Sequence, residues 1–225
     1  MDLQGFGHLL LSGTWVTLQL AFTSLFFGLL LGLIGAALAL SPVPPLRWLA
    51  IGYNTLMRGV PELLLVLIIY FGATHLIAWA TGNYIEVSAF AAGVAALSIA
   101  FGAYATEVFR SAMMEIPQGQ REAALAIGLG RWDTFRRIIL PQLWRLALPG
   151  LGNLFLVLLK DTALVSVIGL DDLMRQASVA AGFTKLPFTF YMAAAGIYLL
   201  LTIVSMQVIQ QLERWANRGY RGVRA

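Results

Sequence analysis

Three acidic residues stand inside long apolar segments of this 225-residue chain, where they could do chemistry: Glu62, Glu107 and Asp161. A charged group in hydrocarbon surroundings is expensive, so an ionisable residue at such a position is a functional hypothesis by default. Glu62 and Asp161 offer acceptor oxygens that could hold a cationic group at low dielectric. Glu107 precedes Arg110 by one helical turn, which predicts an internal ion pair between the two.

Neutral hydrogen-bonding groups accompany this acidic pair. We expect the hydroxyls of Ser98 and Thr162 to contribute to the same ligand site. Other interpretations stay open for the two acids. Glu62 could stabilise the N-terminus of its own helix, and Asp161 could pair with Lys160 or lie in water at the edge of an apolar layer.

The sequence offers no metal site, no cofactor site and no catalytic cluster. Cysteine is absent, and His8 and His75 are isolated from each other and from carboxylates at ligand spacing. Neither Lys160 nor Lys185 follows the glycine loop that cradles the phosphates of ATP. Scattered serines without a base provide no nucleophile, which argues against an intramembrane enzyme.

The elements that must position these residues are membrane helices. The chain is 59% hydrophobic and 12% charged, and its mean hydropathy is +0.79. Segments long enough to cross the roughly 30 Å hydrocarbon core are predicted near residues 14–40, 60–80, 88–113, 137–159 and 188–211. We therefore predict an all-α polytopic membrane protein, a single domain over residues 1–225 with its core at about 14–212.

Short sequence features predict how the first helices pack and end. Gly28, Gly32 and Gly35 line one side of the first span, and small residues at such spacing favour close helix packing. The proline-rich segment 41–45 ends that helix and turns the chain back. Residues 46–58 then read as a short amphipathic piece before the second span.

The basic residues predict an orientation across the membrane. One group of loops and ends holds Arg47, Arg58, Arg121, Arg131, Arg136, Arg137, Arg214, Arg218, Arg221 and Arg224. The other side has only Lys160, Arg175 and Lys185. The positive-inside rule places the N-terminus outside and the C-terminus in the cytoplasm. No basic cluster with interleaved aromatics is present, so nucleic acid is not an expected partner.

The loop at 118–141 is too polar for the membrane, although it connects two membrane spans. It reads Glu122-Ala123-Ala124, three residues, Gly128, nine residues, then Ile138-x-Leu140-Pro141. Good helix formers with exposed charges predict a short helix outside the lipid, suited to docking in a groove of a partner. Gly128 permits a tight turn or a left-handed backbone angle, and Pro141 suits the start of the next span.

This spacing resembles the cytoplasmic-loop signature of permease subunits of binding-protein-dependent ABC importers. Two further segments resemble the polar-amino-acid subgroup of these permeases, of the histidine/lysine/arginine/ornithine or opine type: Arg58-Gly59-Val60-Pro61-Glu62 and the stretch 160–169. Ala163 departs from that subgroup, in which Ser is commoner. The resemblance implies the transmembrane domain of a type I ABC importer in a bacterial inner membrane.

The resemblance also implies roles and partners. The polar loop would be a coupling helix that rests on an ATPase subunit, with the coupling residues Glu122, Ala123, Ala124, Gly128, Leu140 and Pro141. Two ATPase subunits would bind ATP and Mg²⁺, a second permease would complete the path, and a periplasmic binding protein would deliver the solute. Because Glu62 and Asp161 are acidic, a basic amino acid is the favoured solute, with opines next.

Alternatives remain at this stage. An ion-coupled secondary transporter or channel could use Glu62 and Asp161 as ion ligands, but it leaves the ordered loop unexplained. On the opposite side, Asp171, Asp172 and Arg175 are predicted to lie in an outer loop. That loop could dock a solute-binding protein or simply be solvated.

Overall fold

Long apolar helices make up most of the protein. The computed structural model describes residues 5–83 and 86–218. In chain order its helices are α1 (Gly7–Ala39), α2 (Pro44–Gly59), α3 (Glu62–Thr81), α4 (Ala89–Glu115), α5 (Gln118–Ala126), α6 (Arg131–Thr134), a π-helical turn η1 (Phe135–Ile139), α7 (Leu140–Asp161), a 3₁₀ segment η2 (Thr162–Ile168), α8 (Leu173–Thr184) and α9 (Pro187–Ala216). Within the described residues, five helical stretches are long and apolar enough to cross a membrane, which confirms the predicted number.

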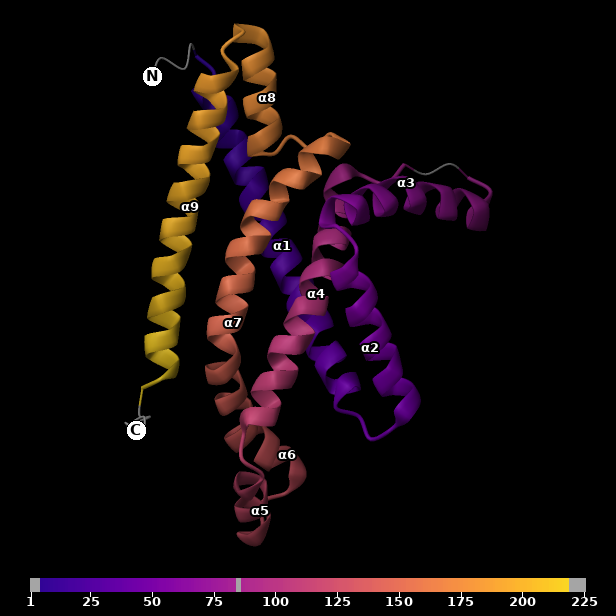
Figure 1. Cartoon of the computed structure of the whole chain (residues 1–225), viewed down its shortest axis with the longest axis vertical. Coiled ribbons are helices and arrows are strands. Elements are labelled where there is room, and N and C mark those ends of the chain that lie inside the picture. Colours follow the sequence, from indigo (N-terminus) through magenta and orange to yellow (C-terminus); the bar gives the residue numbers. More distant parts are fainter. Residues whose placement is uncertain (1–4, 84–85, 219–225) are drawn as a thin grey trace.

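Helices α1 and α4 form the centre of the bundle and run toward the same end (Figure 1). Their contact depends on glycine. A Cβ atom on Gly28 would lie 2.6 Å from Cδ1 of Phe101, and one on Gly32 would lie 2.6 Å from Cβ of Ala105. The two helices could not approach this closely with larger side chains. The prediction that this face of the first span packs on protein is therefore confirmed.

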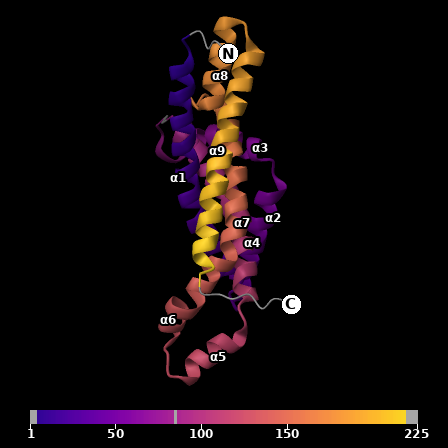
Figure 2. The same cartoon turned by 90° about the vertical axis from the view of Figure 1, so that its left-hand side faces the viewer.

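The chain turns sharply between α2 and α3. Helix α2 runs back along α1 and α4, and α3 then leaves the bundle sideways (Figures 1 and 2). Between them Val60 and Pro61 are extended, with ψ of 131° and 135°, as expected for a residue before proline. The prediction that groups Arg58 with the residues of the loops and chain ends is wrong. Arg58 lies in the last turn of α2, at the end of that helix away from the loop.

A nearly continuous helix connects the polar loop with Asp161. The fourth span runs from Arg131 to Ile168, so it begins before the predicted residue 137. It contains the π-helical turn, and Pro141 occupies its predicted place in the first turn of α7. Pro149 lies inside α7, and Asp161 ends that helix.

The two ends of the molecule differ. Helices α5 and α6 protrude at one end, where α9 also finishes, whereas α1 begins at the other end beside α8 (Figure 2). The outer surface of α9 is largely uncovered by protein, since only 6% of its most apolar window is buried. This suits a helix whose neighbour is lipid.

Asp172 corrects the expectation of a solvated outer loop. It is fully buried and caps α8: its Oδ1 accepts a hydrogen bond from the backbone N–H of Arg175 at 2.9 Å. The backbone N–H of Leu173, the residue after Asp172, donates to Oγ1 of Thr17 at 3.1 Å, and this hydrogen bond links α8 to α1. Burial raises the pKa of the Asp172 carboxyl to about 6. Asp171 stays exposed and pairs with Arg175 at 3.6 Å.

Candidate functional site

A narrow hollow between α3, α4 and α7 brings the predicted acidic pair together. Its polar lining consists of Glu62, Tyr104 and Asp161, and its walls are apolar: Leu97, Ala100, Phe101, Leu154, Val157 and Leu158. The cavity volume is about 30 Å³, which is enough for about one water molecule. We call it the acidic hollow. Two carboxylates from helices far apart in sequence therefore meet in apolar surroundings.

Separate features of the fold hold the two acids. Glu62 stands in the first turn of α3, directly after the break at Pro61, and its Oε1 accepts a hydrogen bond from the hydroxyl of Tyr104 at 3.3 Å. Asp161 is half-buried at the last residue of α7, where the chain passes into the 3₁₀ segment η2. The acids thus mark a helix start and a helix end.

The two predicted hydroxyl contributors lie elsewhere. Ser98 is buried between α4 and α1, and its hydroxyl donates to the carbonyl of Ser24 at 3.2 Å. Thr162 is fully buried, and its hydroxyl donates to the carbonyl of Leu159 at 2.7 Å. Neither side chain lines the acidic hollow, because each hydroxyl bonds to backbone within the packed helices. We leave both out of the candidate site.

A second, wider hollow adjoins Tyr104 on its α2 side. It is lined by Ile51, Asn54, Thr55, Arg58, Gly59, Tyr104 and Glu107, and its volume is about 500 Å³. The guanidinium carbon of Arg58 lies 5.5 Å from the centre of the Tyr104 ring, a cation–π distance. We call this second hollow, which contains Arg58, the basic hollow. The sequence analysis did not predict Arg58 as a site residue. The signal that could have indicated it is its position four residues before Glu62, across the glycine and proline at 59 and 61.

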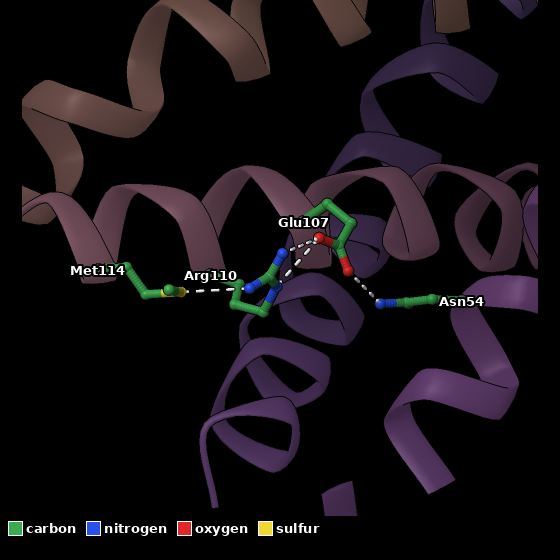
Figure 3. Close-up of polar contacts among 4 residues, drawn as sticks. All are labelled: Asn54, Glu107, Arg110 and Met114. Atoms are coloured by element: carbon green, nitrogen blue, oxygen red, sulfur yellow. Dashed lines mark hydrogen bonds and ion pairs between the residues drawn. The ribbon is translucent and has the colours of Figure 1, made fainter. Parts of the chain in front are cut away.

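Glu107 lines the basic hollow, and its carboxylate bonds to Arg110 and Asn54 (Figure 3). Its Oε2 accepts from Nη2 of Arg110 at 2.7 Å and from Nε at 3.0 Å, which confirms the predicted ion pair. Its Oε1 accepts from Nδ2 of Asn54 at 3.0 Å. Because Asn54 belongs to α2 and Glu107 to α4, the carboxylate links these two helices.

The polar loop forms a helix with a defined stop. Gly128 has a φ of +81°, which confirms the predicted left-handed turn. The N–H of Gly128 donates to the carbonyl of Leu125 at 3.0 Å, and the N–H of Leu129 donates to that of Ala124 at 3.0 Å. These two bonds form a Schellman motif, a common way to end a helix. The signature glycine therefore fixes the direction in which the chain leaves α5.

The loop also presents an apolar surface outside the bundle. Leu125, Ile127 and Trp132 are 56%, 77% and 70% exposed, whereas Ala124 is buried against the loop's own structure. Glu122 and Ala123 are exposed, Leu140 is half-buried, and Pro141 is exposed at the start of α7. Large apolar side chains gathered on a protruding element indicate a protein contact surface.

Together these features define a class: a polytopic helical membrane subunit with a charged interior site and a protruding helix built to contact another protein. The chain belongs to the family described as the inner membrane component of binding-protein-dependent transport systems, which matches residues 24–217. This confirms the resemblance inferred from the loop signature.

Individual relatives match over nearly the whole chain. The nopaline transport system permease protein NocQ of Agrobacterium fabrum is 48% identical over 223 residues, covering 96% of this chain and 94% of the relative. The arginine ABC transporter permease protein ArtQ of Haemophilus influenzae is 47% identical over 219 residues, covering 97% and 98%.

Solved structures share the fold. A crystal structure of an amino acid ABC transporter with histidines matches with a TM-score of 0.79 and 37% identity, covering 92% of this chain and 93% of that one. An inward-facing MetNI methionine ABC transporter matches with a TM-score of 0.76 at 21% identity, which supports the fold alone. The predicted fold class, a type I ABC importer transmembrane domain, is confirmed.

Proposed function

We propose that this chain is the permease subunit of an ATP-driven importer for a basic amino acid or an opine with a similar cationic end. The meeting of Glu62 and Asp161 in one apolar-walled hollow carries this proposal. Two carboxylates at low dielectric repel each other, and a cationic group between them relieves that repulsion.

Names of the relatives agree with this solute class. The relatives described above are called nopaline and arginine permeases, and a further one, 43% identical, is called a histidine/lysine/arginine/ornithine permease. Arginine, lysine and ornithine carry a cationic side chain, and nopaline carries a guanidinium group. The acidic hollow supplies the residues that would recognise this shared feature.

The coupling loop supports a separate motor. In our proposal, two ATPase subunits bind ATP and Mg²⁺ and receive the exposed side chains of Leu125, Ile127 and Trp132. Their closure displaces the loop, and the helix from Arg131 to Asp161 carries the displacement to the acidic hollow. The path then alternates between its two openings, as in other transporters driven by rigid-body motion.

The remaining partners follow from the surfaces. The sideways helix α3 leaves apolar surface uncovered, since 17% of its most apolar window is buried, and a second permease, identical or homologous, would cover it. The end that carries α5 and α6 faces the cytoplasm and the N-terminus faces outward, in accordance with the positive-inside rule. A periplasmic binding protein would then dock at the α8 end, near Asp171 and Arg175.

Uptake in proteoliposomes tests the proposal. The permease is reconstituted with its ATPase, its partner permease and its binding protein, and uptake of L-arginine, octopine and L-glutamate is followed with and without ATP. We expect ATP-dependent uptake of L-arginine and octopine, the two solutes that carry a guanidinium group. We also expect Asp161→Asn to weaken uptake by roughly 10- to 150-fold, since a lost charge-assisted contact costs about 1.5–3 kcal/mol. Uptake without any ATPase, or unchanged kinetics in the variant, would contradict the proposal.

A further inference from the structure

A groove lies where α1 and α4 end and the protruding helix α5 begins (Figure 1). Its volume is about 510 Å³, and it is lined by Ala37, Leu40, Met113, Met114, Ile116, Gln118 and Arg121. In the proposed orientation this is the cytoplasmic boundary of the lipid layer, because the polar loop lies just beyond it. We call it the boundary groove.

The boundary groove is apolar toward α1 and α4. Leu40 and Met114 are 39% and 65% exposed, so no other part of the described chain covers them. Exposed apolar surface of this kind marks contact with protein or with a membrane. The unbranched and flexible methionine side chain adapts to ligands of variable shape. This part of the groove therefore suits a flexible hydrocarbon chain.

Arg121 places a positive charge at the α5 end of the groove. Its Nη2 donates to Sδ of Met113 at 3.4 Å, so the side chain reaches back from α5 toward α4. A thioether is a weak and uncharged acceptor. No carboxylate in residues 5–83 and 86–218 lies within the 4.0 Å that defines an ion pair with this guanidinium. Its charge is therefore free to pair with an anion.

Arg110, one of the neighbouring arginines, shows the contrast. Its Nη1 donates to Sδ of Met114 at 3.2 Å, and its Nη2 also lies 2.7 Å from Oε2 of Glu107. Both arginines thus contact a methionine near the end of α4, but the charge of Arg110 is compensated within the chain. Arg121 has no such compensation among the described residues, and it is the one that lines the boundary groove.

A phospholipid carries its groups in the same order as this groove, with hydrocarbon chains on one side of a phosphate. A guanidinium group fits phosphate oxygens with two parallel hydrogen bonds. Basic pockets between membrane helices on the cytoplasmic side recognise anionic head groups in this way. A free phosphate ion would leave the apolar part of the groove uncovered, so the lipid matches both parts.

We propose that the boundary groove binds one anionic phospholipid, with its phosphate on the guanidinium of Arg121 and an acyl chain along Leu40 and Met114. Because Arg121 belongs to α5 and the apolar side chains belong to α1 and α4, the bound lipid braces the polar loop against the bundle. Lipid binding does not depend on the solute or on ATP. Its effect on coupling rests on the proposed function.

Photolabelling of the assembled importer locates the lipid. Phosphatidylglycerol with a diazirine in one acyl chain is added to phosphatidylcholine vesicles that contain the importer, and adducts on this chain are mapped by peptide mass. We expect adducts within residues 37–40 and 113–116. Phosphatidylcholine with the same diazirine chain should label these segments several-fold less. Both lipids should label the exposed face of α9 at Leu199 and Leu200 equally.

Variants separate the head group from the chain. Arg121→Gln should raise the phosphatidylglycerol concentration needed for half-maximal labelling by about tenfold or more, and Arg121→Lys should retain part of the preference. Arg47→Gln, which removes an exposed arginine of α2 outside the groove, is the matched control and should change little. Ala37→Phe fills the groove and should reduce labelling at 113–116, whereas Ala126→Phe at the exposed end of α5 should not. Unchanged labelling of α9 shows that each variant remains folded in the membrane.

The remaining outcomes overturn the lipid site or its role. Equal labelling by the two lipids, or full labelling in Arg121→Gln, overturns the anionic site. Adducts seen with the permease alone but not with the assembled importer assign the groove to a partner subunit and overturn it as well. Phosphatidylglycerol should raise the ratio of solute imported to ATP hydrolysed in the wild type but not in Arg121→Gln, and an equal response overturns the bracing role. Failure of import with intact labelling counts against the proposed function instead.

Discussion

Gly128 gives the sharpest test of the coupling loop, because the requirement for glycine there is conformational and not steric. Its φ is +81°, yet a Cβ atom at this position would meet nothing within 4 Å. Gly128→Val would therefore fit the available space but strain the backbone. A non-glycine residue in this region costs about 1–3 kcal/mol, with β-branched residues the least tolerated. The chain relieves such strain by giving up the Schellman motif that ends α5.

The consequence for coupling follows from that free energy. A cost of 1–3 kcal/mol lowers the population of the native loop by roughly 5- to 150-fold relative to an alternative of equal energy. We expect the ratio of solute molecules imported to ATP molecules hydrolysed to fall strongly in Gly128→Val. The amount of permease in the membrane should stay unchanged, because the loop lies outside the bundle (Figure 2).

The loop supplies its own matched control. Gly130 also has open space at its Cβ position, but its φ is −64°, which any residue adopts. Gly130→Val should therefore keep coupling, and Gly128→Asn should be intermediate because asparagine tolerates left-handed angles. The assay measures uptake and ATP hydrolysis in the same proteoliposomes. Equal coupling ratios in Gly128→Val and Gly130→Val would refute the reasoning.

Two further predictions concern stability, measured as thermal unfolding of the purified protein in detergent. Asp172→Asn keeps a capping side chain but removes a buried charge, so it should raise stability by up to about 3 kcal/mol above pH 6, since one pKa unit corresponds to 1.36 kcal/mol. The raised pKa of Asp172 means that protonation stabilises the native protein. The stability advantage of the variant should therefore shrink as the pH falls from about 6 toward 3.8. An advantage that grows as the pH falls would contradict this expectation. Gly32→Ala should destabilise by about 1–3 kcal/mol, because its Cβ would lie 2.6 Å from Cβ of Ala105 and overpacked helices must move apart. Gly72→Ala, which has open space in α3, is the matched control and should be neutral or stabilising, and equal losses in the two would exclude the packing argument.

Sequence patterns predicted the features that depend on local residue order. Apolar length indicated the membrane helices, and helical spacing indicated the pair of Glu107 and Arg110. The loop signature indicated both the turn at Gly128 and the helix start at Pro141. Each of these follows from residues close together in the chain, for which backbone preference and helical periodicity are sufficient.

The missed features depend on contacts between distant residues. Asp172 is buried because α8 packs on α1, where Thr17, far away in sequence, receives the neighbouring N–H. Arg58 reaches Tyr104 because α2 folds back along α4, and hydropathy carries no information on the direction of a helix. Similarly, the hydroxyl of Ser98 is used in helix packing, a role that the polarity of the residue alone does not reveal.

The nearly continuous helix from Arg131 to Ile168 restricts how many residues can be inserted into this segment. Each residue turns an α-helix by about 100° and advances it by 1.5 Å. Inserting a single residue between Pro141 and Asp161 would rotate the protruding helices α5 and α6 by more than a quarter turn relative to the carboxylate of Asp161, whereas inserting seven residues would restore the phase within about 20°. The π-helical turn at Phe135–Ile139, just before this stretch, already departs from the α-helical phase. Angular phase, as much as side-chain identity, is therefore a constraint on this segment.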